Sequence, residues 1–435
     1  MSKLATQPYK GARDFYPDQL RLRSYVFEKW RKVARKFGYQ EYDAPILEPF
    51  ELFAAKSGEE IVSEQLFNFE DKAGRRLAIR PELTPSTVRM LAGKYNELVK
   101  PARWFMIGNN WRYERPQKGR GREFFQLEVN IFGEASVDAD FEIFQVIIAV
   151  MQEFGANDTN FSVNVSDRKL LKALLADELM LSAEQVLSAR RIMDKWKKIS
   201  PEDFSAMLKQ AGIGEEAIKK IAEFMNTEFA DLEKVVSSKI LNDNKGYQDL
   251  FKLFSLLKKN GLESFVKFDP GIIRGFDYSD GLVYEVFDKN PENRRSLFGG
   301  ERFDKLISIF DDSFDLPATG FAMGDITLEE FLTGWSLLPE LQQSTQVYVT
   351  LFEESFRDQT LETAVILREH GINTITALSA EKMDKQLKYA HKLGIPYVII
   401  IGPDEAASGK VSLKKLQTGE QVTDTIEEII GTIQI

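Results

Sequence analysis

Residues 102–133 read ARWFMIGNNWRYERPQKGRGREFFQLEVNIFG, and this stretch decides the fold. Two runs rich in β-branched and aromatic residues flank a loop of proline, glycine and basic residues, a pattern that predicts an antiparallel hairpin with a long connection. Alternation in the second run places Phe124, Gln126, Glu128 and Asn130 on one face and apolar residues on the other. We therefore expect a sheet with one polar working surface and one apolar face that packs into a core.

The loop between the two predicted strands is strongly basic. It carries one acid, Glu114, and the cationic side chains Arg112, Arg115, Lys118, Arg120 and Arg122. A solvated hairpin tip would explain such a loop. The alternative is an anion site, because arginine binds phosphate or carboxylate through two parallel hydrogen bonds and Gly119 and Gly121 allow close backbone approach.

Composition excludes several kinds of chemistry. The chain has 435 residues, a net charge of −10, no cysteine and two histidines, His370 and His391. Thiolate metal sites, iron–sulfur clusters, cysteine nucleophiles and multi-histidine metal sites are therefore excluded, and a histidine-based triad is not expected. We predict no protein-built metal cluster, no membrane span and a cytoplasmic location. The acidic net charge means that any nucleic-acid contact must come from local basic patches.

Outside the hairpin, helical and strand-like patterns divide the chain into segments. An amphipathic helix is predicted from about Asp18, expected to cap it, to Phe37. Residues 167–260 are rich in Lys, Glu and Leu and carry two helix-start signals, at Ser182 and at Ser200. Strand and helix patterns alternate from Gln346 onwards, as in an α/β unit. We expect a core in two parts, 1–166 and 261–338, a helical insertion at 167–260 and a C-terminal domain at 345–435.

One predicted helix in the C-terminal segment has a lysine face. Lys382, Lys385, Lys388 and Lys392 are spaced by three or four residues, so they share one side of a helix. Simple solvation would explain these lysines. The alternative is a surface for the phosphates of a nucleic acid.

Taken in order, these segments resemble the histidyl-tRNA synthetase family of class II aminoacyl-tRNA synthetases. The matching segments are GARDFYPD, APILEP, RPELTP, WRYERPQKGRGREFFQLEVNIFG, RGFDYSDGLVYE, FGGERFD, GFAMG and KQLKYAHKLGIPYVIIIG. The resemblance implies an α+β fold, with a class II antiparallel sheet flanked by helices, a helical insertion and a C-terminal α/β anticodon-binding domain. It also implies a homodimer, because the Asp18 helix and APILEP resemble the dimer-forming motif of the class.

The implied activity is a two-step ligation. L-histidine reacts with ATP, accompanied by Mg²⁺, to give histidyl-adenylate, and the acyl group then passes to tRNA(His). Such chemistry needs positioning and charge neutralisation more than acid–base groups, which suits a site rich in arginine. The sequence does not name the Mg²⁺ ligands.

The resemblance assigns roles residue by residue. The catalytic pair is Arg112, on the α-phosphate, and Arg274. Residues that match histidine-binding positions are Glu82, Thr84, Arg112, Gln126, Asn130, Arg274, Tyr278 and Ser279. Residues assigned to ATP are Arg112, Glu114, Arg120, Arg122 and Phe124, with Phe124 stacked on adenine. Residues assigned to tRNA are Gln117, Lys118, Lys385 and Lys388.

Four positions depart from the family pattern. Asn130 and Ser279 stand at the positions where members of the family commonly bind the imidazole ring through an acidic residue and a tyrosine. Phe303 stands where the motif G-G-R-Y-D has its tyrosine, and Thr327 stands where the class has an arginine for the γ-phosphate. We expect Arg120 and Arg122 to replace that arginine. Two alternatives stay open: a regulatory subunit of ATP phosphoribosyltransferase, and a ligase for another amino acid.

Overall fold

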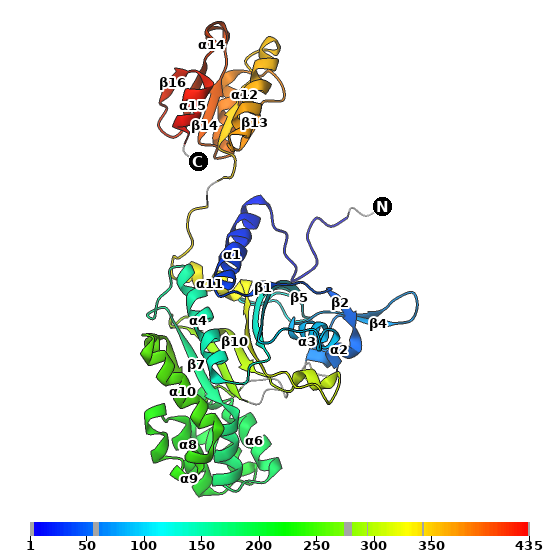
Figure 1. The fold of residues 1–435 in the computed structure, drawn as a ribbon, viewed down its shortest axis with the longest axis vertical. Helices are drawn as coiled ribbons and strands as arrows, with labels where there is room; N and C mark the ends of the chain where they lie inside the picture. Colours follow the sequence, from blue (N-terminus) through cyan, green and yellow to red (C-terminus); the bar gives the residue numbers. More distant parts are fainter. Residues whose placement is uncertain (1–3, 55–60, 274–280, 294, 342, 434–435) are drawn as a thin grey trace. The chain divides into compact units, whose positions relative to one another are not determined.

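The computed structural model describes residues 4–54, 61–273, 281–293, 295–341 and 343–433, and the chain divides into two compact units, Met1–Leu338 and Pro339–Ile435. Figure 1 shows both units. None of the described helices is long and apolar enough to cross a membrane.

The first unit is built on a large sheet. In the described part of the chain the sheet has eight strands in the order β1-β5-β6-β11-β10-β9-β7-β8. Neighbouring strands are antiparallel, except for the pairs β1–β5 and β7–β8 at the two edges, which are parallel. The strands are β1 (Gln40–Glu41), β5 (Ala102–Trp111), β6 (Glu123–Phe132), β7 (Phe161–Asp167), β8 (Val266–Phe268), β9 (Leu282–Asp288), β10 (Ser296–Arg302) and β11 (Ala318–Gly324).

The hairpin predicted from residues 102–133 is confirmed. Strands β5 and β6 pair antiparallel over ten residue pairs, from Ala102–Phe132 to Trp111–Glu123. Leu127, Val129 and Ile131 are buried in the main core, as their alternation predicts. The other face of β6 carries the polar residues that the site uses.

Helices cover the apolar face of the sheet. Helix α1 (Pro17–Lys36) packs on α4 (Val137–Glu153), and its Trp30 is fully buried in the core that both helices share. The prediction that Asp18 caps α1 is wrong. Tyr16 occupies the cap position and Pro17 begins the helix, while Asp18 pairs with Arg21 at 2.5 Å. Proline suits a first helical position because it lacks the N–H that would be unpaired there.

The predicted helices between residues 167 and 260 are present between strands β7 and β8. They are α5 (Arg168–Lys172), α6 (Ala183–Met193), α7 (Pro201–Gln210), α8 (Glu215–Met225), α9 (Ser238–Asp243) and α10 (Lys245–Lys259). Both helix-start signals are confirmed, because Ser182 forms a capping box with Gln185 and the Ser200 hydroxyl accepts from the Asp203 N–H. Figure 1 shows α6, α8 and α9 as one bundle.

A three-stranded sheet and three further helices complete the elements that matter for the site. The small sheet has the order β2-β4-β3, formed by β2 (Leu47–Pro49), β3 (Asn68–Glu70) and β4 (Arg76–Ile79). Helix α2 (Phe50–Ala54) follows β2, and α3 (Thr84–Gly93) follows the loop RPEL. Helix α11 (Asp325–Gly334) begins directly after β11.

The second unit has the predicted α/β pattern and two strands that the sequence reasoning missed. Its sheet has the order β13-β12-β14-β15-β16. The elements are β12 (Val347–Val349), α12 (Arg357–Glu369), β13 (Thr374–Thr376), α13 (Met383–Lys392), β14 (Tyr397–Ile400), α14 (Pro403–Ser408), β15 (Val411–Lys415), β16 (Gln421–Asp424) and α15 (Ile426–Thr432). The missed strands, β15 and β16, extend the parallel part of the sheet as an antiparallel hairpin.

Candidate active site

A cavity of about 630 Å³ lies on the polar face of the large sheet. Strands β6, β9, β10 and β11, the loop after β5 and the start of α11 line it. Its volume lies in the range that holds a nucleotide-sized ligand. Five residues predicted to bind substrates contribute to the lining: Arg112, Glu114, Arg120, Phe124 and Gln126.

The Arg112 guanidinium is held in a fixed position by two neighbours. Its Nε donates to the Pro81 carbonyl at 2.9 Å, and its central carbon lies 5.3 Å from the centroid of the Phe124 ring. Because a guanidinium has five N–H donors, the group keeps donors for a ligand after this bond is made. The arginine and the aromatic ring thus lie together at one wall of the cavity.

The Gln126 carboxamide is oriented from the neighbouring strand. The Nδ2 of Asn110, a fully buried residue on β5, donates to Gln126 Oε1 at 2.8 Å. A carbonyl oxygen accepts two hydrogen bonds, so Oε1 retains acceptor capacity for a cation such as an α-ammonium group.

Glu128 is a buried carboxylate to which the sequence reasoning gave no role. It is 1% exposed and accepts hydrogen bonds from the hydroxyls of Tyr42 and Thr87, each at 3.0 Å, and from the hydroxyl of Thr84. Burial raises the pKa of Glu128, and these three hydroxyls together with the Asn130 side chain oppose the rise. Strand alternation already placed Glu128 on the same face as Gln126, and this pattern could have predicted that Glu128 belongs to the site. Thr84 is therefore fixed by Glu128, beside the cavity rather than in its described lining.

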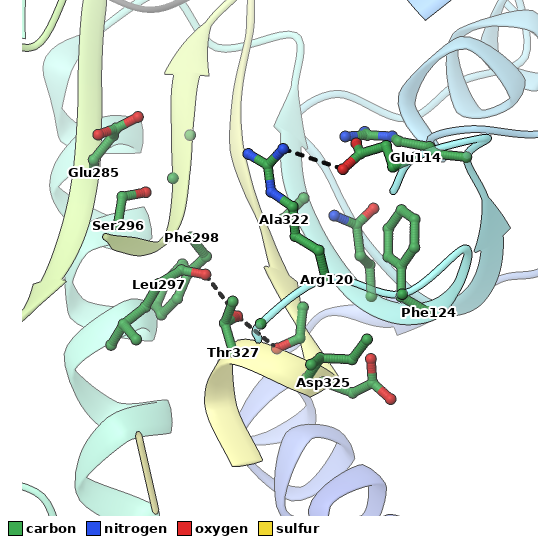
Figure 2. A pocket seen from close by; sticks show the side chains of 18 of the residues that line it. Glu114, Arg120, Phe124, Glu285, Ser296, Leu297, Phe298, Ala322, Asp325 and Thr327 are labelled. Carbon is green, nitrogen blue, oxygen red and sulfur yellow. Dashed lines mark hydrogen bonds and ion pairs between the residues drawn. The ribbon is translucent and has the colours of Figure 1, made fainter. Parts of the chain in front are cut away.

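Arg120 lines the cavity at the end where α11 begins. Figure 2 shows its side chain beside Glu114, with Arg120 Nη1 and Glu114 Oε2 at 3.1 Å. Thr327 lies at the same end and cannot carry a charge. Its hydroxyl donates to the Leu297 carbonyl at 2.7 Å, the bond drawn in Figure 2.

The structure does not bring Arg122 into this cavity. Its Nε donates to the Glu114 carbonyl at 3.1 Å, and its guanidinium carbon lies 4.1 Å from the Tyr113 ring centroid and 5.2 Å from that of Tyr9. Two aromatic faces and a backbone oxygen therefore hold the group away from the described lining. The expectation that Arg122 joins Arg120 at the phosphates lacks geometric support.

The remaining predicted site residues lie in several places. Glu82 is buried in the loop before α3, and Asn130 is buried on β6. Gln117 and Lys118 are exposed on the hairpin loop, where Arg295 reaches the Gln117 side chain and the Lys118 carbonyl, each at 3.4 Å. Arg274, Tyr278 and Ser279 lie outside the described residues.

The lysine face predicted in the second unit lies on α13. Lys385 and Lys388 are both exposed. Lys385 Nζ lies 2.5 Å from Glu381 Oε1, an exposed pair of the kind that water and salt weaken. The two side chains are thus open to a partner.

A mostly antiparallel sheet that presents an arginine, an aromatic ring and an oriented amide to one cavity, in a chain with a separate α/β unit, is the arrangement expected from the resemblance to class II aminoacyl-tRNA ligases. Residues 11–327 match the family described as "Histidyl-tRNA synthetase", and residues 346–434 match "Anticodon binding domain". The chain belongs to the histidyl-tRNA synthetase family, and both the predicted family and the predicted fold class are confirmed.

Individual proteins agree with this membership. The "Histidine--tRNA ligase" of Leptospira biflexa serovar Patoc is 40% identical over 435 residues, covering 99% of this chain and 98% of the relative. The crystal structure of histidyl-tRNA synthetase from Nostoc sp. PCC 7120 superposes with a TM-score of 0.85 at 25% identity, covering 99% of each chain. A Bacillus halodurans structure titled "ATP phosphoribosyltransferase regulatory subunit/histidyl-tRNA synthetase" gives a TM-score of 0.75 at 21% identity, covering 89% of this chain and 97% of the other, and shows the fold alone.

Proposed function

We propose that this protein is a histidine–tRNA ligase. It joins histidine to ATP, forming histidyl-adenylate and pyrophosphate, and then transfers the histidyl group to tRNA(His). The observation that carries this proposal is the 40% identity, along almost the whole chain, to a relative named "Histidine--tRNA ligase". The cavity supports it, because Arg112, Phe124 and Gln126 line one continuous space.

In the first step an oxygen of the histidine carboxylate attacks the α-phosphorus of ATP. A bond forms between that oxygen and phosphorus, the bond from the α-phosphorus to the bridging oxygen breaks, and pyrophosphate leaves. Negative charge grows on the α-phosphate during this exchange, and Arg112, already fixed by Pro81, neutralises it without moving. Arg274 is proposed as the second arginine of this step and lies outside the described residues.

The two ends of the cavity have different proposed ligands. Phe124 stacks on the adenine ring, and Arg120 with Glu114 faces the ATP phosphates and ribose. Gln126, Thr84 and Glu82 bind the α-ammonium group, and the buried carboxylate of Glu128 orients the Thr84 hydroxyl. One carboxylate, one hydroxyl oxygen and one amide oxygen can all accept hydrogen bonds from an ammonium group.

Mg²⁺ is proposed to enter with ATP. The described residues contain no group of three or more acidic or histidine side chains that could hold a metal ion. Mg²⁺ in nucleotide sites takes one or two carboxylates and keeps phosphate and water ligands. Glu285, which lines the cavity in Figure 2, fits such a carboxylate. The ion would neutralise phosphate charge.

The second step needs tRNA, and the second unit is proposed to bind it. Residues 346–434 match the anticodon-binding family, and Lys385 and Lys388 offer a basic face for phosphates. Gln117 and Lys118 on the hairpin loop are proposed to meet the acceptor end. Deleting residues 346–435 should spare adenylate formation and abolish efficient charging. Normal charging by the truncated protein would refute the role of this unit.

The alternatives predict different reactions. A regulatory subunit would form no adenylate, and a ligase for another amino acid would activate that amino acid in place of histidine. ATP–pyrophosphate exchange with each of the twenty amino acids separates these cases. Exchange that depends on histidine alone supports the proposal, whereas no exchange, or exchange with another amino acid, would refute it. The cytoplasmic location stays a prediction.

We also propose a homodimer. Leu47 on β2 and Phe69 on β3 share one face of the small sheet, and both are more than 40% exposed. A two-fold interface would bury such an apolar face. Light scattering should give about twice the 49.7 kDa chain mass, and Leu47→Lys should shift the protein towards monomer. A wild-type monomer at micromolar concentration would contradict this proposal.

A further inference from the structure

The sheet register places three residues in one row across strands β6, β11 and β10. Asn130 pairs with Gly320, and Gly320 pairs with Glu301. Residues directly opposite one another in antiparallel strands point to the same face, so the side chains of Asn130 and Glu301 project from the same face of the sheet. Their Cα atoms are separated by two strand spacings, about 9.5 Å.

The middle position of this row has no side chain. A Cβ atom on Gly320 would lie 1.8 Å from Asn130 Oδ1 and 2.4 Å from the Val129 carbonyl oxygen. The Asn130 side chain therefore occupies space above β11 and extends towards β10, the strand of Glu301. Gly320 is what leaves room for the Asn130 side chain on this side of the sheet.

Glu301 belongs to the lining of the cavity, and Asn130 lies beside that lining on the same face of the sheet. Asn130 is 2% exposed, and its Nδ2 makes no hydrogen bond of standard geometry within the described residues, although the side chain lies close enough to Glu128 to lower the pKa of that carboxyl. A buried donor without a partner is costly, and a ligand that accepts from it removes that cost. Glu301 lines the cavity together with Arg112 and Gln126, the residues assigned to the reacting end of the amino acid.

We propose that Glu301 and Asn130 together recognise the imidazole ring of histidine. This inference rests on the proposed function. A neutral imidazole has one N–H donor and one nitrogen acceptor. The Glu301 carboxylate accepts from the ring N–H, and Asn130 Nδ2 donates to the other ring nitrogen. The carboxylate that accepts from the ring N–H thus belongs to β10, and Gly320 on β11 separates it from Asn130 on β6.

The sequence departures agree with this pairing. Aligning Phe303 with the tyrosine of the family motif G-G-R-Y-D puts Glu301 at a glycine position. The chain therefore gains an acid at 301 and carries an amide at 130, where the family commonly has an acid. The register shows that these two changes lie on one face of the sheet, on either side of Gly320.

Glu128 is the competing carboxylate on this face. It also projects from the polar side of β6, where it accepts hydrogen bonds from the hydroxyls of Tyr42, Thr84 and Thr87. Glu301, unlike Glu128, belongs to the described lining of the cavity. We therefore assign the ring to Glu301 and the orientation of Thr84 to Glu128.

The test compares histidine with β-(2-thiazolyl)alanine, which keeps a ring nitrogen acceptor and lacks the N–H. The readout is kcat/KM for ATP–pyrophosphate exchange with the intact protein and each amino acid. Wild type should prefer histidine strongly. Glu301→Gln should reduce that preference about tenfold or more, because a charged acceptor becomes a neutral one. The KM for ATP should change less than about twofold, since this end of the cavity is remote from the phosphates.

Two further variants separate recognition from folding. Glu128→Gln should weaken both amino acids together and leave their ratio unchanged. The double variant Glu301→Gln with Asn130→Asp returns an acid to position 130, and it should regain at least half of the lost preference on a logarithmic scale. An unchanged ratio in Glu301→Gln, or a double variant no better than the single one, would overturn the assignment. Wild type that activates no histidine would instead refute the proposed function.

Discussion

Replacing Arg120 by alanine tests how the cavity holds ATP phosphates with a threonine at position 327. The Arg120 guanidinium lines the cavity, whereas the Thr327 hydroxyl is bonded to backbone carbonyls. A unit charge at 4 Å from another interacts by about 1 kcal/mol in water and about 4 kcal/mol at the effective dielectric of a protein surface. Arg120 is 48% exposed and already pairs with Glu114, so the low end of this range applies. We expect a loss of about 1–2 kcal/mol, which is a 5- to 30-fold rise in the KM for ATP.

The assay is histidine-dependent ATP–pyrophosphate exchange without tRNA, with ATP titrated at two salt concentrations. The effect of Arg120→Ala should shrink at the higher salt concentration because exposed charges are screened. Arg122→Ala is the matched control: its guanidinium is held by Tyr9, Tyr113 and the Glu114 carbonyl, so the KM for ATP should change less than about twofold. An unchanged KM in Arg120→Ala, or an equal rise in both variants, would show that the assignment of the phosphate end is wrong.

Three further changes have expected outcomes. Arg112→Ala should slow adenylate formation about 100-fold or more, and a near-normal single-turnover rate would remove Arg112 from the reaction. Asp140→Asn, which breaks a fully buried pair with Arg302, should lower the free energy of unfolding by about 3 kcal/mol in urea titrations. Asp138→Asn, on the same helix with a side chain 58% exposed, should cost less than about 0.5 kcal/mol, and equal losses would contradict the burial argument. Hydrogen bonds from Lys32 and Lys29 lower the pKa of Glu153 to about 2, so its stabilisation is complete above its unfolded pKa of about 4.5 and is lost as the pH falls towards 2. The stability difference between wild type and Glu153→Gln, about 1 kcal/mol at pH 7, should therefore shrink below pH 4.5, and a constant difference would refute this.

The predictions that the structure confirms depend on local pattern. The β5–β6 hairpin follows from alternation and from the Gly- and Pro-rich connection between the strands, which neighbouring residues determine. The capping signals at Ser182 and Ser200 likewise act over three residues. Asp18 failed as a cap because the adjacent Pro17 already supplied a favourable first position in α1.

The features that were missed depend on contacts between distant segments. The orientation of Arg122 is set partly by the hydroxyl of Tyr9, 113 positions earlier in the chain. Burial of Glu128 requires hydroxyl groups from the loop after β1 and from α3. The alternation of residues within β6 does not indicate these partners, because they lie on other segments. The placement of Asn130 and Glu301 in one row depends on the order β6-β11-β10, which local spacing does not determine.

Gly320 also bears on how such a site can change during evolution. Because Gly320 has no side chain, the space above β11 accommodates the side chain of residue 130. An ancestor with an acid at 130 could then acquire a second acid at 301 without a steric clash, and lose the first acid afterwards. Each step would be a single substitution, and no intermediate would be without a carboxylate. A larger residue at 320 would collide with the side chain at 130 and block this sequence of substitutions. On the proposed assignment, moving the carboxylate from position 130 to position 301 while histidine specificity is kept therefore depends on Gly320.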